Sequence, residues 1–492
     1  MCMALHSKRR IRAFQKWMNW KGIECSDALE LVEEGSSMFV RAVGDLHEGD
    51  VVAKIPKESC LTIKTSGARR VIEEAQLDGC LGLAVALMYE RSLGPLSPWF
   101  GYLHLLPHSE PIPLLWPLSE ISSLLAGTEL HKIIKEDKIL IHEDWKECIQ
   151  PLLSNSSLKL NPAYFGIEEY FAARSLIASR SFQIDGYHGF GMVPLADLFN
   201  HKTCAEDVHF TSISSYSDSD SDVDDKNSNN EYQHDSTHEP ANQNICSEGE
   251  YSSGSDLDSS SVAGDDPAVL EMIMVKNVKA GYEVFNTYGC LGNAALLHRY
   301  GFTEPDNPYD ILNIDLELVL QWSSSEFSSR HSRRRVSLWR KLAYSGCVSQ
   351  DTEYFEISFH GEPQTELIIL IYLLLVSDEV YDEAHLAVST TCDVGKSWEL
   401  FLSTKGVSFD KGLLELGNRS LLDVRVCMAL LSLADMRESL YGSESLTDDI
   451  NALGGCSWLT QPKLYHSLVL RISERKIIQK LRNYASDRQE RY

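Results

Sequence analysis

The chain has 492 residues, 43% of them hydrophobic, and a formal net charge of −26 at pH 7. This length is too great for one compact core and predicts about two to four domains, while the hydrophobic fraction excludes a wholly disordered chain. Between Glu206 and Asp266, 16 acidic residues stand against one basic residue, Lys226, so this segment alone carries −15 and leaves −11 for the rest. The acidity therefore says little about the folded parts.

Targeting and membrane signals do not stand out in the sequence. The first twenty residues contain neither the apolar core of a signal peptide nor a clear plastid transit peptide. The longest apolar run, 367–376 (LIILIYLLLV), has ten residues, whereas a membrane-spanning helix needs about 18. We therefore expect a protein of the nucleus and/or the cytoplasm.

The first half of the chain alternates between helical and β-rich patterns. Residues 12–27 predict a helix, and two β-rich runs follow, joined by a turn at His47–Asp50. From about 80 to 180 apolar residues recur at spacings of three and four, which is typical of helices. Strand character returns at 189–199 (GFGMVPLADLF).

A Ser/Asp-rich segment at about 212–266 has few apolar residues, so it cannot bury enough surface to order itself. Strand character resumes after it, at 268–289, so the segment interrupts a β domain as a long loop. Beyond about residue 308 the apolar patterns predict helices at 365–376, 421–442 and 464–485. We expect this second domain to be all-helical.

Four short stretches contain the residue types that bind ligands or carry chemistry. They are EEGSSMF (33–39), ASRSF (178–182), DLFNH (197–201) and GYEVFNTYG followed by LLHRYGF (281–302). Each alone has an ordinary explanation: a hairpin, a surface arginine, a turn or buried tyrosines. A metal site is not expected, because the spacing of His201, Cys204 and His209 matches no zinc pattern.

Taken together and in this order, the four stretches resemble those of the SET-domain methyltransferases. They are most similar to the branch with a split SET domain and a helical substrate-binding domain. That branch includes the plant Rubisco large-subunit lysine methyltransferase and the ribosomal-protein and SETD6-like nuclear lysine methyltransferases. The resemblance covers about 12–302 for the SET domain and 310–485 for the helical domain.

The resemblance implies an α+β fold. We expect a β-rich SET domain with a pseudo-knot, split by a helical insertion at about 80–180 and carrying the disordered insert at 212–266. An all-α C-terminal domain follows. It also implies S-adenosyl-L-methionine as the methyl donor.

The family pattern assigns cofactor contacts to Glu34, Ser36, Arg180, Asn200 and His201 of this chain. Backbone groups near Glu34 and Ser36 would meet the methionine part, and Arg180 its carboxylate. Asn200 would offer its amide oxygen to the cofactor ammonium, and His201 would contact the adenine largely through its backbone. The chain departs from the family at 35–37, where Gly-Ser-Ser replaces Gly-x-Gly.

The same resemblance assigns the substrate side of the site. Tyr288 is expected to be the catalytic tyrosine, with its hydroxyl near the transferring methyl. Tyr300 and Phe182 would line the lysine channel, where aromatic faces attract the ammonium. Asp197 would contact the substrate backbone or amine, and Phe210 would belong to the same wall.

The resemblance implies a protein-lysine N-methyltransferase that acts on a non-histone protein, ribosomal or nuclear. Two alternatives stay open. One is protein-histidine methylation, against which Phe182 argues, because histidine-directed relatives carry a polar amide there. The other is a catalytically degenerate SET-like binding module, which the departure at 35–37 motivates and the retained Tyr288, Asn200 and His201 oppose.

As partners, we expect a protein substrate bound through the helical domain, no nucleic acid and no membrane, and a monomeric chain. The basic run at 328–341 (SSRHSRRRVSLWRK) is typical of a solvated helix face, and also of a nuclear import signal or a site for an acidic partner.

Overall fold

The computed structural model describes residues 2–34, 37–155, 158–212, 269–341, 353–390 and 421–489. The chain divides into two compact units. The first contains residues 1–115 and 137–289, and the second contains 116–136 and 290–492. Within the described ranges, no helix is long and apolar enough to cross a membrane. The predicted acidic insert lies almost wholly outside the described residues.

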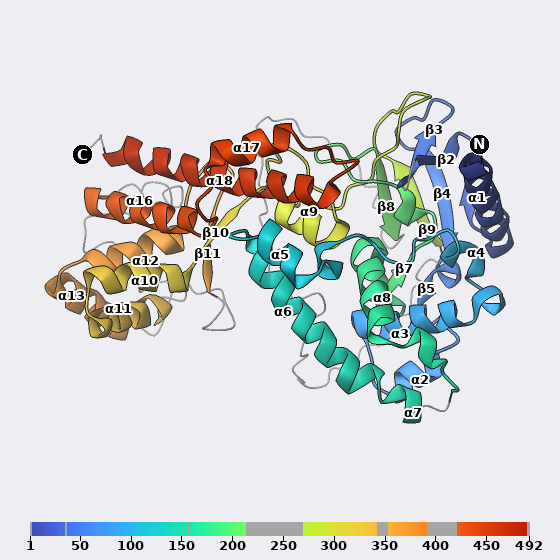
Figure 1. Cartoon of the computed structure of the whole chain (residues 1–492), viewed down its shortest axis with the longest axis horizontal. Coiled ribbons are helices and arrows are strands. Elements are labelled where there is room, and N and C mark those ends of the chain that lie inside the picture. Colours follow the sequence, from blue (N-terminus) through green and yellow to red (C-terminus); the bar gives the residue numbers. More distant parts are fainter. Residues whose placement is uncertain are drawn as a thin grey trace, which may run out of the picture. The chain divides into compact units, whose positions relative to one another are not determined.

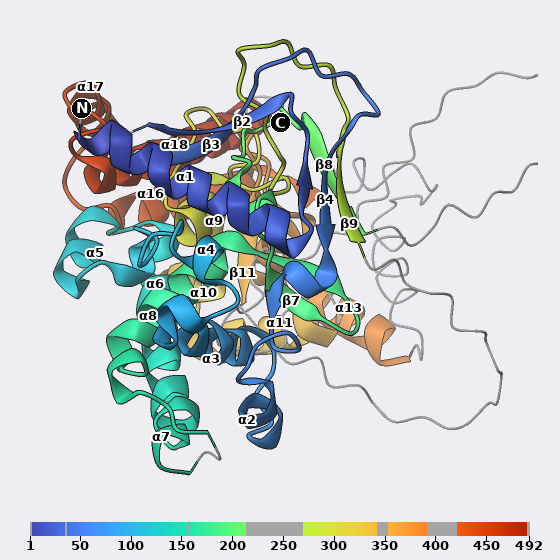
Figure 2. The same ribbon diagram turned by 90° about the vertical axis from the view of Figure 1, so that its right-hand side faces the viewer.

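The described strands of the first unit form three antiparallel sheets. Figure 1 shows where these strands lie. The four-stranded sheet has the order β1 (Glu24–Cys25), β4 (Val51–Pro56), β9 (Val269–Met274), β8 (Val208–Ser212). The two-stranded sheet pairs β2 (Leu29–Glu34) with β3 (Ser37–Ala42). The three-stranded sheet has the order β5 (Leu61–Thr62), β7 (Gly189–Met192), β6 (Ser181–Asp185). Figure 2 shows β4, β8 and β9 side by side.

The helices of the first unit are α1 (Cys2–Lys21), α2 (Arg69–Glu74), α3 (Gly79–Ser92), α4 (Phe100–Leu103), α7 (Leu152–Asn155), α8 (Ile167–Arg180) and the later part of α6 (Glu129–Asp144). Helix α1 precedes the strands in the sequence, and the other helices of the first unit lie between β5 and β6. Helix α3 packs against α8, and its residues Leu83–Leu87 are fully buried. This burial places α8, and Arg180 at its last position, firmly on the unit's core.

The second unit is mainly helical. Its elements are α5 (Leu118–Leu124), the start of α6, α9 (Asn293–Tyr300), β10 (Leu312–Asp315), α10 (Leu316–Glu326), α11 (Ser329–Lys341), β11 (Tyr354–Ile357), α12 (Thr365–Leu375), α13 (Asp378–Thr390), α16 (Val424–Ser439), α17 (Leu446–Gly454) and α18 (Pro462–Gln489). The basic run falls on α11, which buries Arg335 and Trp339.

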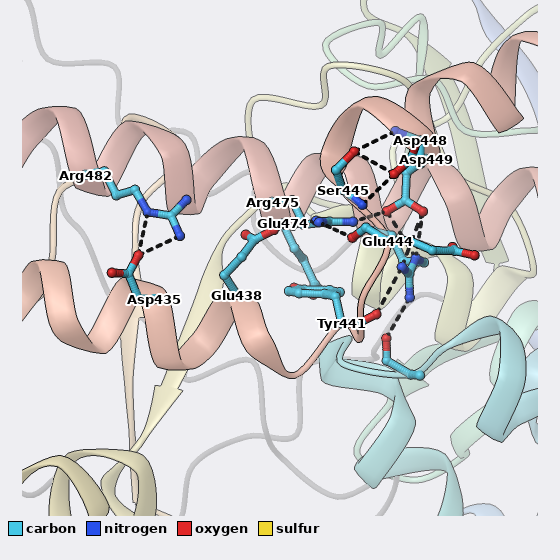
Figure 3. A network of polar contacts seen from close by, with 12 residues as sticks. Asp435, Glu438, Tyr441, Glu444, Ser445, Asp448, Asp449, Glu474, Arg475 and Arg482 are labelled. Atoms are coloured by element: carbon cyan, nitrogen blue, oxygen red, sulfur yellow. Dashed lines mark hydrogen bonds and ion pairs between the residues drawn. The ribbon is translucent and has the colours of Figure 1, made fainter. Parts of the chain in front are cut away.

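A buried ion network joins α16, α17 and α18 (Figure 3). Asp449 is 1% exposed and accepts from both Arg475, at 2.6 Å, and Arg471, at 3.3 Å. Arg475 also pairs with Glu438 at 2.6 Å. Burial makes these pairs costly to break singly, because removing one partner leaves the other charge unpaired.

The predicted α+β class, with β strands in the first unit and a helical C-terminal region, is confirmed. The expectation of an all-α second domain is wrong in one detail, since β10 and β11 form a two-stranded sheet. Leu312 and Ile314 are buried on one strand, Phe355 and Ile357 on the other. Each strand has only four residues and no hairpin turn joins them, so the pattern carried no local signal.

Residues 116–136 cluster with the second unit, although the sequence pattern assigned them to the insertion in the first domain. Their apolar side chains explain this assignment. Ile121, Leu125 and Ile134 are fully buried in a cluster with Leu297 of α9 and Leu470 of α18. These partners lie far along the chain, so helical spacing alone could not reveal them.

Candidate functional site

Two of the four motifs meet side by side in the first unit. The backbone N–H of Asn286 donates to the carbonyl oxygen of Asn200 at 2.8 Å, and His201 forms a parallel bridge with Asn286. Val208, at the start of β8, forms a second parallel bridge with Asn286. These contacts join the DLFNH and VFNTYG stretches, which the sequence separates by the acidic insert.

The backbone next to this junction is strained. Leu195 has a φ of 75°, although it is a fully buried residue with a side chain that disfavours this left-handed region. It precedes the single turn Ala196–Leu198, which carries Asp197. Strain of this kind persists only where the surroundings enforce it, and it concentrates at functional sites.

The ring of His201 contacts both the main chain and the ring of Tyr288. The Nδ1 atom of His201 accepts the backbone N–H of Tyr288 at 3.0 Å, and the two rings stack with centroids 5.1 Å apart and planes 23° apart. His201 is only 8% exposed. Because Nδ1 accepts, a neutral His201 ring carries its proton on Nε2, which lies 3.3 Å from the hydroxyl oxygen of Thr203.

The hydroxyl of Tyr288 is held by the DLFNH motif, which also contains His201. It donates to the carbonyl oxygen of Phe199 at 3.1 Å. The phenolic oxygen therefore lies next to the main chain of DLFNH, with its ring held by His201. The tyrosine expected to be catalytic thus has both ends of its side chain in contact with the same five-residue stretch.

Asn200 has a defined amide orientation. Its Nδ2 donates to Oε1 of Glu283 at 2.8 Å, and because a carboxylate can only accept, the amide nitrogen must face Glu283. The amide oxygen then faces elsewhere and is available to a donor. Burial raises the pKa of Glu283, while the hydrogen bond from Asn200 and the charge of Lys202 oppose this rise.

Arg180 lies at the centre of a second polar cluster in the same unit. Its Nε donates to Oε1 of Glu110 at 2.6 Å, and one of its amino groups (NH1) donates to both the carbonyl oxygen, at 3.1 Å, and Oδ2, at 3.2 Å, of Asp197. Tyr102 donates its hydroxyl to the same Oδ2 at 2.9 Å. Burial alone would lower the pKa of Arg180, but the charges of Asp197 and Glu110 raise it. Arg180 therefore keeps its charge.

The side chain of Asp197 is fully enclosed, with 0% of it exposed. Burial raises its pKa, and the charge of Arg180 opposes that rise. Its Oδ1 has no hydrogen-bond partner among the described residues. The structure therefore places Asp197 with Arg180 and Tyr102, and its expected contact with the substrate stays a prediction.

Phe182 and Phe210 form a tilted pair, with ring centroids 5.0 Å apart and planes 39° apart. Phe182 comes from β6 and Phe210 from β8, and both are partly buried against the core. The two aromatic residues expected to share a substrate wall are therefore neighbours.

Two of the expected site residues cannot be placed with the rest. Ser36 lies outside the described residues. Tyr300 is the last residue of α9 in the second unit, where Gly301, with a φ of 79°, ends the helix. A group of three His, Cys, Asp or Glu side chains that could hold a metal ion does not occur within the described ranges.

The motif reasoning missed three residues that hold the site together: Tyr102, Glu110 and Glu283. Glu283 stands beside the VFNTYG stretch, so its neighbourhood carried some signal. Tyr102 and Glu110 lie in the helical insertion, in stretches whose apolar and proline pattern points only to packing and turns.

The fold of this chain is similar to that of solved LSMT structures. A solved structure of Rubisco LSMT bound to AdoMet has 18% identity and a TM-score of 0.63, and the match covers 98% of this chain and 92% of that chain. A structure of the SET domain of LSMT bound to lysine and AdoHcy matches equally well, with 17% identity and a TM-score of 0.63 over 98% of this chain and 91% of that one.

Sequence comparison agrees with the fold. The N-lysine methyltransferase setd6 of Xenopus tropicalis is 24% identical over 491 residues, which are 95% of this chain and 93% of that protein. The ribosomal lysine N-methyltransferase 3 of Saccharomyces cerevisiae is 26% identical over 63% of each chain. No family model matches the chain. The resemblance to the SETD6, ribosomal and Rubisco branch of SET-domain lysine methyltransferases is confirmed.

Proposed function

We propose that this chain is an S-adenosyl-L-methionine-dependent protein-lysine N-methyltransferase that acts on a non-histone protein. The single observation that carries the proposal is the junction of the DLFNH and VFNTYG motifs, where His201 and Phe199 hold Tyr288. The sequence similarity to N-lysine methyltransferases over nearly the whole chain supports it.

The residues present fit the cofactor. The amide oxygen of Asn200 suits an ammonium group, because Glu283 occupies the amide nitrogen. Arg180 keeps its charge and suits a carboxylate. Glu34 and the backbone of His201 keep their expected cofactor contacts as part of the proposal. Ser36, outside the described residues, keeps its expected backbone contact as part of the proposal. S-adenosylmethionine, when bound, supplies an electrophilic methyl group on a sulfonium.

The substrate side of the proposal assigns the catalytic role to Tyr288. Its hydroxyl positions the lysine amine, and alignment of reacting groups can supply up to about 7–11 kcal/mol of a barrier. Phe182 and Phe210 form an apolar wall, and burial of this kind lowers the pKa of a lysine so that its amine is neutral. Asp197 and Tyr300 keep their expected substrate contacts as part of the proposal.

The second unit is proposed to bind the protein substrate. This unit is compact and has its own hydrophobic core, which includes residues of α10, α12, α16 and α18. We further propose that the chain acts as a monomer without nucleic acid, in the nucleus and/or the cytoplasm. The pseudo-knot of the SET domain also stays a prediction.

Methyl transfer from radiolabelled S-adenosylmethionine to proteins of a cell extract tests the proposed activity. After acid hydrolysis we expect the label in methyl-lysine, with none above background for Tyr288→Phe. Label in methyl-histidine would replace the lysine assignment. Calorimetric titration with the cofactor tests the remaining alternative, a catalytically degenerate binding module. A protein that binds S-adenosylmethionine without transferring its methyl group would be such a module.

A further inference from the structure

The guanidinium of Arg180 is only partly used by the protein. An arginine has five N–H donors in a fixed plane. Nε is taken by Glu110, and the first amino group (NH1) donates to Asp197 through two contacts, at 3.1 and 3.2 Å. Its second amino group (NH2) makes no hydrogen bond to any residue that the structure describes. The protein therefore fixes the plane of the guanidinium and leaves one edge for a ligand.

Glu110 is itself held by the helix that carries Arg180. The backbone N–H of Glu110 donates to the hydroxyl oxygen of Ser175 at 3.0 Å, and Ser175 lies in α8, five residues before Arg180. Ser175 is fully buried. Glu110 and Arg180 therefore share one rigid support, and the 2.6 Å contact between their side chains is set by that support.

Tyr102 fixes the other partner of Arg180. It is fully buried and donates to Oδ2 of Asp197, the oxygen that Arg180 also approaches. Its ring packs against Phe14 and Trp17 of α1, with centroids 6.2 and 6.0 Å away. The tyrosine hydroxyl thus anchors Asp197 to the core, and Asp197 in turn fixes the first amino group of Arg180.

We propose that Glu110 and Tyr102 are positioning residues, which hold Arg180 so that its free edge binds the carboxylate of S-adenosylmethionine. The inference rests on the proposed function and deepens it. An arginine with its plane fixed in advance loses less conformational freedom when it binds a carboxylate, and its donors match carboxylate geometry. Neither Glu110 nor Tyr102 needs to touch the cofactor.

The charge of Glu110 is a separate matter from its hydrogen bond. Two carboxylates already lie against one guanidinium, so a third carboxylate gains nothing from the negative charge of Glu110. What the inference requires is an acceptor at Nε of Arg180. Glu110→Gln keeps an acceptor of the same length, whereas Glu110→Ala removes it. The two substitutions therefore separate positioning from charge.

The test compares two ligands on the full-length protein. S-adenosylmethionine carries the carboxylate, and 5′-methylthioadenosine lacks the whole amino-acid part. For Glu110→Ala we expect the Kd for S-adenosylmethionine to rise at least tenfold, with the Kd for methylthioadenosine within twofold of the wild type. Glu110→Gln should stay within threefold for both ligands. Tyr102→Phe should raise the Kd for S-adenosylmethionine at least threefold, again with little change for methylthioadenosine.

Tyr170→Phe is the matched control. Tyr170 is a fully buried tyrosine of the same unit, and its hydroxyl accepts from Arg174 at 2.9 Å. We expect the removal of the Tyr170 hydroxyl to leave both Kd values unchanged. An equal loss of affinity for both ligands in Glu110→Ala and Tyr102→Phe would overturn the inference, because a general structural defect weakens the binding of both ligands. Unchanged binding of S-adenosylmethionine in Tyr102→Phe, which deletes one oxygen, would also overturn it.

The failure of this inference and of the proposed function are distinguishable. A wild-type chain that binds neither ligand contradicts the proposed function itself. A wild-type chain that binds S-adenosylmethionine more tightly than methylthioadenosine, with the same preference in both variants, contradicts only the roles of Glu110 and Tyr102.

Discussion

The imidazole of His201 and the phenol of Tyr288 are stacked 5.1 Å apart, and the same imidazole accepts the backbone N–H of Tyr288 at 3.0 Å. One histidine therefore fixes both the position and the tilt of the tyrosine that we propose to be catalytic. The ring of His201 therefore has a structural role in holding Tyr288.

His201→Phe keeps an aromatic ring beside Tyr288 but removes the Nδ1 acceptor. A buried N–H without a partner costs about 1–3 kcal/mol, so we expect the free energy of unfolding to fall by about that amount and kcat to fall with it. Urea denaturation and an initial-rate assay check the two effects. The control is His209→Ala, because the side chain of His209 is exposed and, among the described residues, pairs with Glu206 alone. The free energy of unfolding of this variant should stay within about 0.5 kcal/mol of the wild-type value. Equal unfolding free energies for His201→Phe and the wild type would contradict this role.

Asn200→Ala removes the amide whose oxygen we assign to the cofactor ammonium. Hydrogen bonds to charged groups contribute about 1.5–3 kcal/mol, so the Kd for S-adenosylmethionine should rise roughly 10- to 100-fold. Calorimetry measures this directly. Asn161→Ala serves as the control, because Asn161 caps a short helical turn at Ala163 and should affect stability alone. Equal cofactor affinity for the Asn200 variant and the wild type would remove Asn200 from the proposed site.

Glu474 makes the second unit sensitive to pH. Burial raises its pKa from 4.5 to about 8, although Arg437 opposes the rise, and Tyr441 donates its hydroxyl to the carboxylate. Glu129 also pairs with Arg437, and burial raises the pKa of Glu129 as well. A single guanidinium between two buried carboxylates favours keeping one proton on the pair.

The direction of the pH effect follows from this raised value. Between about pH 4.5 and 8 the folded chain holds a proton at Glu474 that the unfolded chain has released. The contribution of Glu474 to the free energy of unfolding is therefore greatest below about pH 4.5 and is lost as the pH rises to about 8. Glu474→Gln cannot titrate, so its free energy of unfolding should decline less between pH 5.5 and 8.5, by about 1 kcal/mol or more. Urea curves at both pH values check this, with the exposed Glu444→Gln as control. Parallel pH profiles for Glu474→Gln and the wild type would show that Glu474 titrates normally.

The acidic segment is predicted to be dispensable for folding. Strands β8 and β9 are hydrogen-bonded neighbours in antiparallel register, with Ser212 opposite Leu270, so a short turn can join them. Replacing 213–268 with a four-residue Gly/Asn linker should leave the melting temperature unchanged or slightly raised, because a shorter loop costs about 0.6 kcal/mol less per halving. Circular dichroism during heating measures it. Aggregation or a lower melting temperature would show that the segment supports the fold.

The sequence was sufficient to predict the class of fold and to single out motifs that the structure brings together in the first unit. The ordered motifs located Arg180, Asn200, His201 and Tyr288, because each stands in a short local pattern. It was not sufficient where a contact joins distant residues. The partners of Arg180 come from the helical insertion, and the four-residue strands β10 and β11 pair across a long interval. Such contacts depend on tertiary packing, which leaves no period in the local sequence.

The boundary between the two units also depends on contacts between distant residues, so the sequence pattern did not predict it. Helix α5 has an apolar pattern that suits any helical environment, and only its packing with Leu297 and Leu470 assigns it to the second unit. Tyr300 likewise follows a recognisable motif, yet it lies on a helix of the second unit, so its place in the substrate channel stays a proposal.

The central claim, lysine methylation with Tyr288 as the catalytic tyrosine, is tested most directly by quantitative mass spectrometry of methyl-lysine in cells. Cells that lack the protein are complemented with the wild-type chain or with Tyr288→Phe, the variant being expressed to the same level. We predict that at least one lysine of a non-histone protein regains its methyl group with the wild-type chain and stays unmethylated with Tyr288→Phe. The same methyl-lysine sites restored to the same extent by both chains would contradict the role of Tyr288, and the absence of any restored methyl-lysine would contradict the activity itself.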